Sequence, residues 1–403
     1  MIKRILYTLL IMFPVVASAQ INTDRVMAIG RNALYFEDYV LSIQYFNQVI
    51  NAKPYLSDPY FYRGLAKINL DDFQGAESDC SEAIERNPFV VSAYQVRGLA
   101  RIQQNNFAGA IEDYTKALEF APENIGVWHN MALCRIRQED YKGAKNDLDK
   151  LIAISPRYTK AYLMRGEVDL KQKDTLAAEK DFGKAIEIDR YDADTWASRA
   201  ILRLQQQRYK DAEADFDHAI RLSTRNSGVY INRALARYHQ NNLRGAMSDY
   251  DIALDIDPNN FIGHYNRGLL RAQVGDDNRA IQDFNFVIEM EPDNMMAIFN
   301  RGLLLDQTGD YKGAIKDYST VINEYPNFLL GYQYRAQARR KIGDVKGADA
   351  DEFKVLKAQL DKQNGVDPNK QTADNTENNK TRKKSDKNMN NYRKIVVADN
   401  EEG

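Results

Sequence analysis

Small, aromatic and polar residues recur along the chain with a fixed 34-residue period. Counted from Thr23, position 8 of each unit is Gly or Ala, position 20 is Ala in every unit after the first, and position 24 is most often aromatic. Prolines follow the same period near the ends of most units: Pro54, Pro88, Pro122, Pro156, Pro258, Pro292 and Pro326. A period of this length indicates a repeat array. The pattern therefore predicts ten units, without insertion or deletion, ending near Lys362.

Each recurring position has a physical role in a pair of antiparallel helices. Small residues at positions 8 and 20 allow the two backbones to approach closely, and the aromatic residue at position 24 fills the volume between them. Segments such as 104–110, 274–280 and 308–314 supply the turn, with Gly or Asn ending the first helix. The proline ends the second helix.

This pattern resembles the tetratricopeptide repeat family. Position 4 is also aromatic in most units, as the family requires: Tyr60, Tyr94, Trp128, Tyr162, Trp196, Tyr230 and Tyr332. The resemblance implies an all-α fold, a right-handed superhelical α-solenoid of about ten 34-residue helix–turn–helix repeats spanning residues 20–362. The terminal repeats depart from the pattern at Thr23, Val26 and Glu352, as expected where one side of a repeat faces water.

Opposite charges follow the same period. Position 7 is Arg in eight units and position 23 is Asp in units two to ten. We expect each Arg to form a forked ion pair with the Asp across the two helices. A ladder of ligand-binding charges is the alternative. The first unit favours ion pairs, because both positions lose their charge together, at Ile29 and Tyr45.

Residues 1–19 have the features of a signal peptide. Lys3 and Arg4 precede a short apolar run, which ends at the small residues Ala17, Ser18 and Ala19. An uncleaved anchor helix is the alternative, but the run is shorter than the roughly 20 residues that a membrane span requires. We predict cleavage after Ala19 and an exported bacterial protein, periplasmic or secreted, without a membrane span.

Composition and motifs narrow the range of functions. A net charge of −2 argues against nucleic acid as a partner. Cys80 and Cys134 occupy different repeat positions, which predicts two free, buried thiols. The four histidines lack metal-ligand spacing, and no nucleophile or phosphate-loop motif occurs. We therefore predict a protein that is not an enzyme and holds no cofactor.

The resemblance implies that the first helix of each pair lines a concave groove, with positions 2, 5 and 6 among those facing it. Position 6 is Asn in repeat 4 and in consecutive repeats 7 to 9, and a side-chain amide can meet the N–H and C=O of one peptide residue. Position 2 becomes apolar in repeats 8 to 10 and position 5 in repeats 7 to 9, which is typical of an interaction surface. The predicted peptide-binding residues are Asn130, Asn232, Asn266, Asn300, Ile231, Tyr265, Phe299, Ile262, Met296 and Leu330.

Other interpretations of these residues stay open. The asparagines could satisfy helix ends or face water, and the apolar residues could pack against the neighbouring repeat. The apolar stripe of repeats 8–10 is also compatible with self-association into a homo-oligomer.

The tail is of a different composition. Residues 363–403 are rich in Asn, Lys and Asp, which predicts disorder. The segment from Tyr392 to Asp399 alternates like a strand, and either docks elsewhere or begins a further domain.

The features together favour a scaffold or adaptor of the cell envelope that binds an extended peptide or a partner protein. The alternative is a subunit or fragment of an envelope enzyme complex.

Overall fold

The computed structural model describes residues 22–223, 225–364, 389–396 and 398, and its regular elements are all helical in these ranges. The predicted signal peptide and most of the predicted disordered tail lie outside the described residues, so both stay predictions. The first helices of the ten repeats are α2 (Thr23–Tyr35), α4 (Asp58–Ile68), α6 (Val91–Gln103), α8 (Ile125–Arg137), α10 (Thr159–Lys171), α12 (Ala193–Gln205), α14 (Ser227–His239), α16 (Phe261–Gln273), α18 (Met295–Thr308) and α20 (Leu329–Lys341). The second helices are α3 (Tyr39–Ala52), α5 (Phe73–Arg86), α7 (Phe107–Phe120), α9 (Tyr141–Ile154), α11 (Thr175–Ile188), α13 (Tyr209–Leu222), α15 (Leu243–Ile256), α17 (Asp277–Met290), α19 (Tyr311–Glu324) and α21 (Val345–Gln363).

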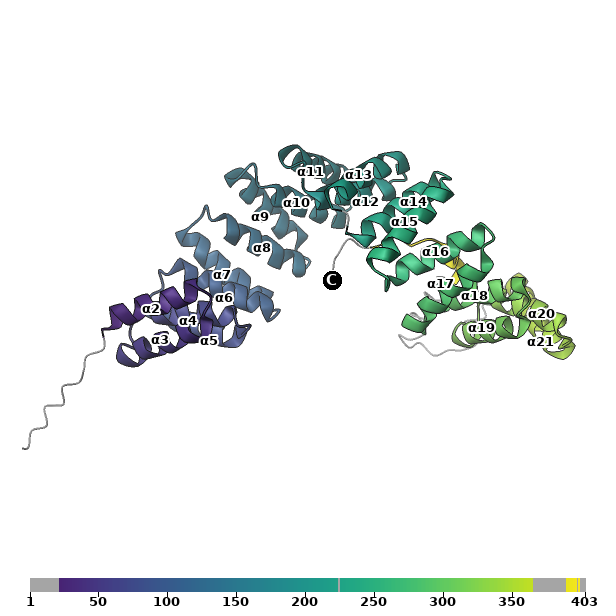
Figure 1. The fold of residues 1–403 in the computed structure, drawn as a ribbon, viewed down its shortest axis with the longest axis horizontal. Helices are drawn as coiled ribbons and strands as arrows, with labels where there is room; N and C mark the ends of the chain where they lie inside the picture. Colours follow the sequence, from purple (N-terminus) through teal and green to yellow (C-terminus); the bar gives the residue numbers. More distant parts are fainter. Residues whose placement is uncertain (1–21, 224, 365–388, 397, 399–403) are drawn as a thin grey trace, which may run out of the picture. The chain divides into compact units, whose positions relative to one another are not determined.

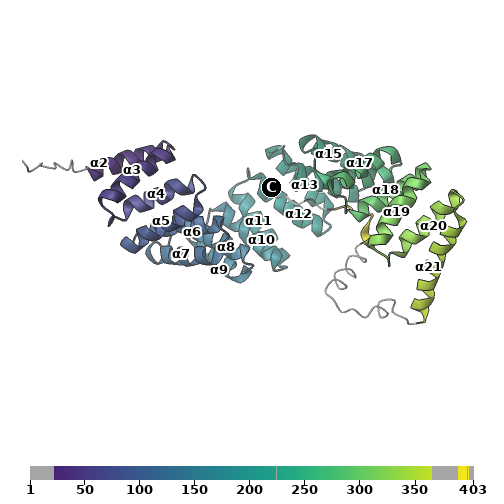
Figure 2. The same cartoon turned by 90° about the horizontal axis from the view of Figure 1, so that it is seen from below.

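The chain forms two compact units, Met1–Ile188 and Asp189–Gly403. The first contains α2 to α11, and the second contains α12 to α21 (Figures 1 and 2). Within each unit, the two helices of a repeat pack on each other, and the second helix packs on the first helix of the next repeat. The predicted all-α array of helix pairs is therefore confirmed.

The small positions lie where the two helices of a repeat come closest. The position-20 side chains, Ser42 in the first repeat and Ala in the other nine, are fully buried. A Cβ atom added at Gly98 would lie 2.7 Å from the ring of Tyr114, which is the position-24 aromatic of the same repeat. No side chain fits there without moving that ring, so the small residues determine how closely the helices pack.

The turn between the helices requires a left-handed residue at position 15 of all ten repeats. Gly275, Gly309 and Gly343 adopt this conformation freely. Seven repeats use other residues, including Lys173 (φ 65°) and Gln207 (φ 61°), at a cost of about 1–2 kcal/mol each. The prediction of Gly or Asn at the turn is correct for the three segments named above. At several other turns the helix packing imposes the conformation on Glu, Asp, Lys or Gln.

The Arg–Asp ladder consists of ion pairs between the two helices of a repeat, as predicted. Eight pairs have nitrogen–oxygen distances of 2.5–2.8 Å: Arg63–Asp79, Arg97–Asp113, Arg165–Asp181, Arg199–Asp215, Arg233–Asp249, Arg267–Asp283, Arg301–Asp317 and Arg335–Asp351. All these aspartates are buried. Repeat 4 differs, because Met131 occupies the Arg position and Asp147 pairs instead with Arg135 at 2.7 Å.

The pKa values of the buried aspartates differ between repeats. Burial raises the pKa of Asp147 to about 6, because the single cation Arg135 only partly offsets the loss of water. Burial also raises the pKa of Asp283, but hydrogen bonds from His264 and Arg267, with the charges of Arg267 and Arg271, lower it below its ordinary value. The pKa is therefore raised at one aspartate and lowered at another, although both occupy the same position of their repeats.

The first prediction concerns the ladder. Replacing Asp249 by Ala leaves Arg233 and Arg237 without their shared partner and should lower the free energy of unfolding by about 3–5 kcal/mol. The control is Asp251→Ala, because Asp251 is half exposed and pairs with Arg267 at the surface, where such pairs contribute about 0–1 kcal/mol. Chemical denaturation of the full chain measures both. Equal losses for the two variants would contradict a structural role for the ladder.

The second prediction concerns pH. Because the folded pKa of Asp147 lies above its unfolded value, its stabilising contribution is present at low pH and is lost as the pH rises towards 6. The variant Asp147→Asn should therefore gain stability relative to wild type between pH 4 and 7, by up to roughly 3 kcal/mol. For Asp283, whose pKa is lowered, the contribution is present above the unfolded pKa and is lost only in more acidic solution. Asp283→Asn should thus remain destabilising throughout pH 5–7, and parallel pH profiles for the two variants would refute this assignment.

Candidate peptide-binding site

Three of the four predicted asparagines lie in a row on consecutive first helices of the second unit. Asn232 on α14, Asn266 on α16 and Asn300 on α18 occupy the same position of their repeats, and all three are buried. We call these three residues the asparagine ladder. Asn130 occupies the same repeat position on α8, in the other unit, and is half-buried.

A segment from the end of the chain lies against the asparagine ladder. It comprises Met389–Val396 and Ala398, and we call it the C-terminal segment. It begins with a short 3₁₀ helix, η1 (Met389–Asn391), in contact with α18, and it appears in yellow in Figure 1. It passes α18, α16 and α14 in that order, opposite to the order of the repeats, as its hydrogen bonds show.

Two asparagines each bind the backbone of one residue through both ends of the side-chain amide. Asn266 donates from Nδ2 to the carbonyl oxygen of Val396 at 2.7 Å and accepts from its N–H at 2.8 Å. Asn232 does the same with Ala398, at 2.8 and 2.9 Å. Val396 and Ala398 are two residues apart, so successive repeats bind alternate residues of the segment. This spacing suits an extended chain, in which the backbone groups of every second residue point to the same side.

The third rung binds the backbone in a different way. Asn300 Nδ2 and the hydroxyl of Tyr265 both donate to the carbonyl oxygen of Tyr392, each at 2.6 Å. The residues bound by Asn300 and Asn266, Tyr392 and Val396, are four positions apart rather than two. The extra length lies in a turn, in which the N–H of Lys394 donates to the carbonyl oxygen of Asn391 at 2.8 Å.

Side chains of the C-terminal segment pack into apolar clusters of the repeats. The ring of Tyr392 meets that of Phe299 edge-on, with centroids 4.8 Å apart. Ile395 packs against the cluster that includes Leu204 and Leu235, and Ala398 is buried in the cluster that includes Ile231.

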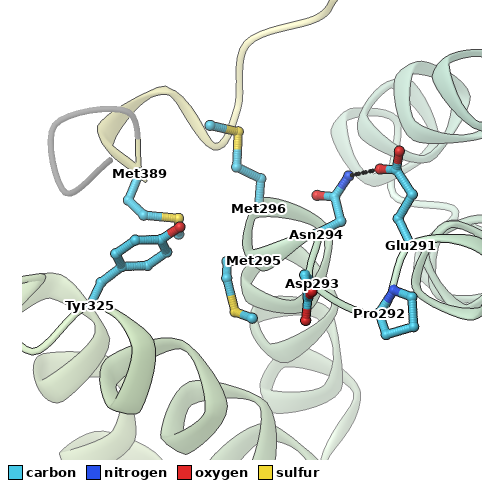
Figure 3. Close-up of a pocket in the computed structure, with 8 residues that line it drawn as sticks. All are labelled: Glu291, Pro292, Asp293, Asn294, Met295, Met296, Tyr325 and Met389. Carbon is cyan, nitrogen blue, oxygen red and sulfur yellow. Dashed lines mark hydrogen bonds between the residues drawn. The ribbon is translucent and has the colours of Figure 1, made fainter. Parts of the chain in front are cut away.

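Met389 anchors the beginning of the segment beside a pocket of about 600 Å³. Figure 3 shows its side chain next to the ring of Tyr325, with Met295 and Met296 on the adjoining wall. Met389 is buried in the cluster that contains Phe299, so the same apolar cluster holds both Met389 and Tyr392.

The apolar residues predicted at positions 2 and 5 are less exposed than a free binding stripe would be. Ile231, Tyr265 and Phe299 are buried, and each belongs to a different hydrophobic cluster of the second unit. The position-2 residues are partly buried: Ile262, Met296 and Leu330. Part of this burial comes from the C-terminal segment, which contacts Phe299 and shares a cluster with Ile231.

Two flanking pockets involve residues that the sequence analysis did not name. One, of about 400 Å³, is lined by Tyr238, Leu269, Phe284 and Leu303, together with Arg393 and Ile395. The other, of about 420 Å³, is lined by Leu204, Leu235, Tyr238 and Ile395 among others. Leu235, Leu269 and Leu303 share position 9 of their repeats, so the 34-residue period would have revealed them once position 9 was included.

Comparisons with known families agree with the repeat geometry. Three profiles described as tetratricopeptide repeat match the chain, at residues 91–124, at 125–158 and 159–192, and at 198–261 and 265–327. These matches cover more than half of the sequence. The chain belongs to the tetratricopeptide repeat family.

Solved structures of other tetratricopeptide repeat proteins resemble parts of this chain. A protein from Parabacteroides merdae ATCC 43184 is 21% identical, with a TM-score of 0.48 over 62% of this chain and 98% of its own. YrrB, described as a TPR protein with an unusual peptide-binding site, is 20% identical, with a TM-score of 0.39 over 46% of this chain and 95% of its own. MamA is 18% identical, with a TM-score of 0.39 over 42% of this chain and 92% of its own. No curated protein matches the chain in sequence.

Within the described residues, no cluster of His, Cys, Asp or Glu has the arrangement of a metal site. Cys80 and Cys134 are free and buried, as predicted, and burial raises the pKa of Cys80 to about 12 and that of Cys134 to about 11. Such thiols are poor nucleophiles at neutral pH. Burial also raises the pKa of Tyr265, which keeps its hydroxyl protonated as a donor. None of the helices in the described ranges has the length and hydropathy needed to cross a bilayer.

Proposed function

We propose that this protein is a non-catalytic scaffold that holds an extended segment of a partner protein on α14, α16 and α18. The observation that carries the proposal is the paired hydrogen bonding of Asn232 and Asn266, each to both backbone groups of one residue. Bonds of this kind require an extended backbone but do not depend on the identity of the bound residue's side chain. The apolar clusters beside them would add side-chain contacts.

Membership of the tetratricopeptide repeat family supports the same function, because stacked helical repeats create the extended surfaces that such proteins use for binding. We further propose that the protein acts in the cell envelope after export. The support is the basic start at Lys3 and Arg4, the apolar run after it and the small residues before Gln20.

The third prediction tests the asparagine ladder. In a chain whose C-terminal segment is released by Tyr392→Ala with Ile395→Ala, replacing Asn232 and Asn266 together by Ala removes the four hydrogen bonds that a partner would make, which should weaken partner binding by roughly 2–6 kcal/mol, or about 30-fold or more. The partner is to be captured from envelope extract with the full-length protein and identified by mass spectrometry, its binding segment mapped with overlapping peptides, and the affinity measured by calorimetry.

The matched control is Asn130→Ala, which changes the same repeat position in the other unit and should leave the affinity unchanged. An unaltered affinity in a double variant that retains its helical circular dichroism would rule out the ladder as the binding site. Turnover of a substrate by the purified protein in hydrolase or transferase assays would instead favour the enzyme-complex alternative.

The fourth prediction concerns export. Signal peptidase requires small residues before its cleavage point, so N-terminal sequencing of the native protein should begin at Gln20. Recovery of a chain that begins at Met1 from the soluble fraction would show that the segment is not removed.

A further inference from the structure

The side chains of the C-terminal segment that contact the repeats recur every three residues, partly buried at Tyr392 and Ile395 and buried at Ala398. Tyr392 meets Phe299, Ile395 packs on the cluster of Leu204 and Leu235, and Ala398 is buried beside Ile231. Between them, Arg393, Lys394 and Val396 are exposed, and Val396 exposes 43% of its surface although its backbone is bound at both ends. The repeats therefore contact a pattern of aromatic, aliphatic and small residues rather than every side chain.

The segment uses the same groups that a partner peptide would need. The amides of Asn232 and Asn266 are fully buried and bonded to Ala398 and Val396, and the hydroxyl of Tyr265 is bonded to Tyr392. An extended peptide from another protein cannot make these bonds while the segment is in place. The segment is tethered to the site because both belong to the same chain. Its effective concentration there can therefore reach the millimolar range.

We propose that the C-terminal segment is a built-in competing ligand of the asparagine ladder, and that the partner is a peptide with the same pattern. This pattern is an aromatic residue, a β-branched aliphatic residue three positions later and a small residue three positions after that. The inference rests on the proposed function and adds the specificity and the regulation of the same site.

The two flanking pockets explain how a partner displaces a tethered segment. The segment leaves about 400 and 420 Å³ beside Arg393 and Ile395, along walls formed by Leu269, Leu303 and Leu235. A partner with a bulkier apolar side chain at either place makes contacts that the segment lacks. It can therefore bind more tightly while using the same backbone hydrogen bonds.

The fifth prediction is measured with a fluorescein-labelled synthetic peptide of residues 389–400 and the full-length protein. In the opened variant, Tyr392→Ala with Ile395→Ala, the segment loses the two large side chains that pack beside the asparagine ladder, and the asparagines become accessible. By fluorescence anisotropy, the opened variant should bind the peptide at least tenfold more tightly than wild type. The matched control, Lys394→Ala, changes an exposed residue of the same segment and should behave as wild type.

Two further arms test the site and the pattern. Adding Asn232→Ala and Asn266→Ala to the opened variant should abolish peptide binding. A peptide that itself carries Tyr392→Ala and Ile395→Ala should bind the opened variant at least tenfold more weakly than the native peptide. Both results together would establish that the peptide uses the ladder and is recognised by its aromatic and aliphatic side chains.

The outcomes separate this inference from the proposed function. Equal affinity of wild type and opened variant for the native peptide would show that the segment does not compete, and would overturn the inference. So would equal binding of the native and substituted peptides. If the captured partner binds through the asparagines while the native peptide binds no variant, the scaffold function holds and the built-in ligand is refuted.

Discussion

Close packing of two helices within each repeat is the constraint on which the other features depend. The backbones approach until only Gly or Ala fits at position 8, and at Gly98 a single added carbon would lie 2.7 Å from the ring of Tyr114. This contact fixes the orientation of the first helix about its own axis. In α14, α16 and α18, position 6 therefore faces the same way in each repeat. Three asparagines, each one repeat from the next, become one row of amides because the helix pairs beneath them are packed alike.

The Arg–Asp ion pairs also fix how the two helices of a repeat are placed. Each guanidinium forks onto a carboxylate of the second helix, so the angle between the helices is set by hydrogen bonds as well as by contact. Burying these charges carries a desolvation cost that hydrophobic residues would avoid, so the ladder is better explained by fixed geometry than by net stability. Repeat 4 is consistent with this cost, because burial raises the pKa of Asp147, which has one cationic partner, to about 6.

The sequence could predict the features that depend on its period. Helix pairs, ion pairs and the row of asparagines all involve residues that recur at a fixed position of successive repeats. The left-handed turns at Lys173 and Gln207 could not be predicted from residue type, because packing overrides local preference there. The contact of Ala398 with Asn232 could not be predicted either. It joins residues 166 positions apart, and no period relates the tail to the repeats.

In the proposed function, the asparagine ladder and the side-chain clusters divide the recognition of an extended chain between them. The bond that Asn266 Oδ1 accepts from a backbone N–H can be donated by any residue except proline, and the exposed side chain of Val396 shows that it imposes no side-chain requirement. Selectivity must therefore come from the contacts beside the ladder, where Phe299 meets an aromatic ring and a cluster that includes Ile231 encloses a methyl group. A larger residue in place of Ala398 would have to displace that cluster while keeping both bonds to Asn232. The ladder thus fixes the register of the bound chain, and the fixed register is what allows the clusters to discriminate between side chains.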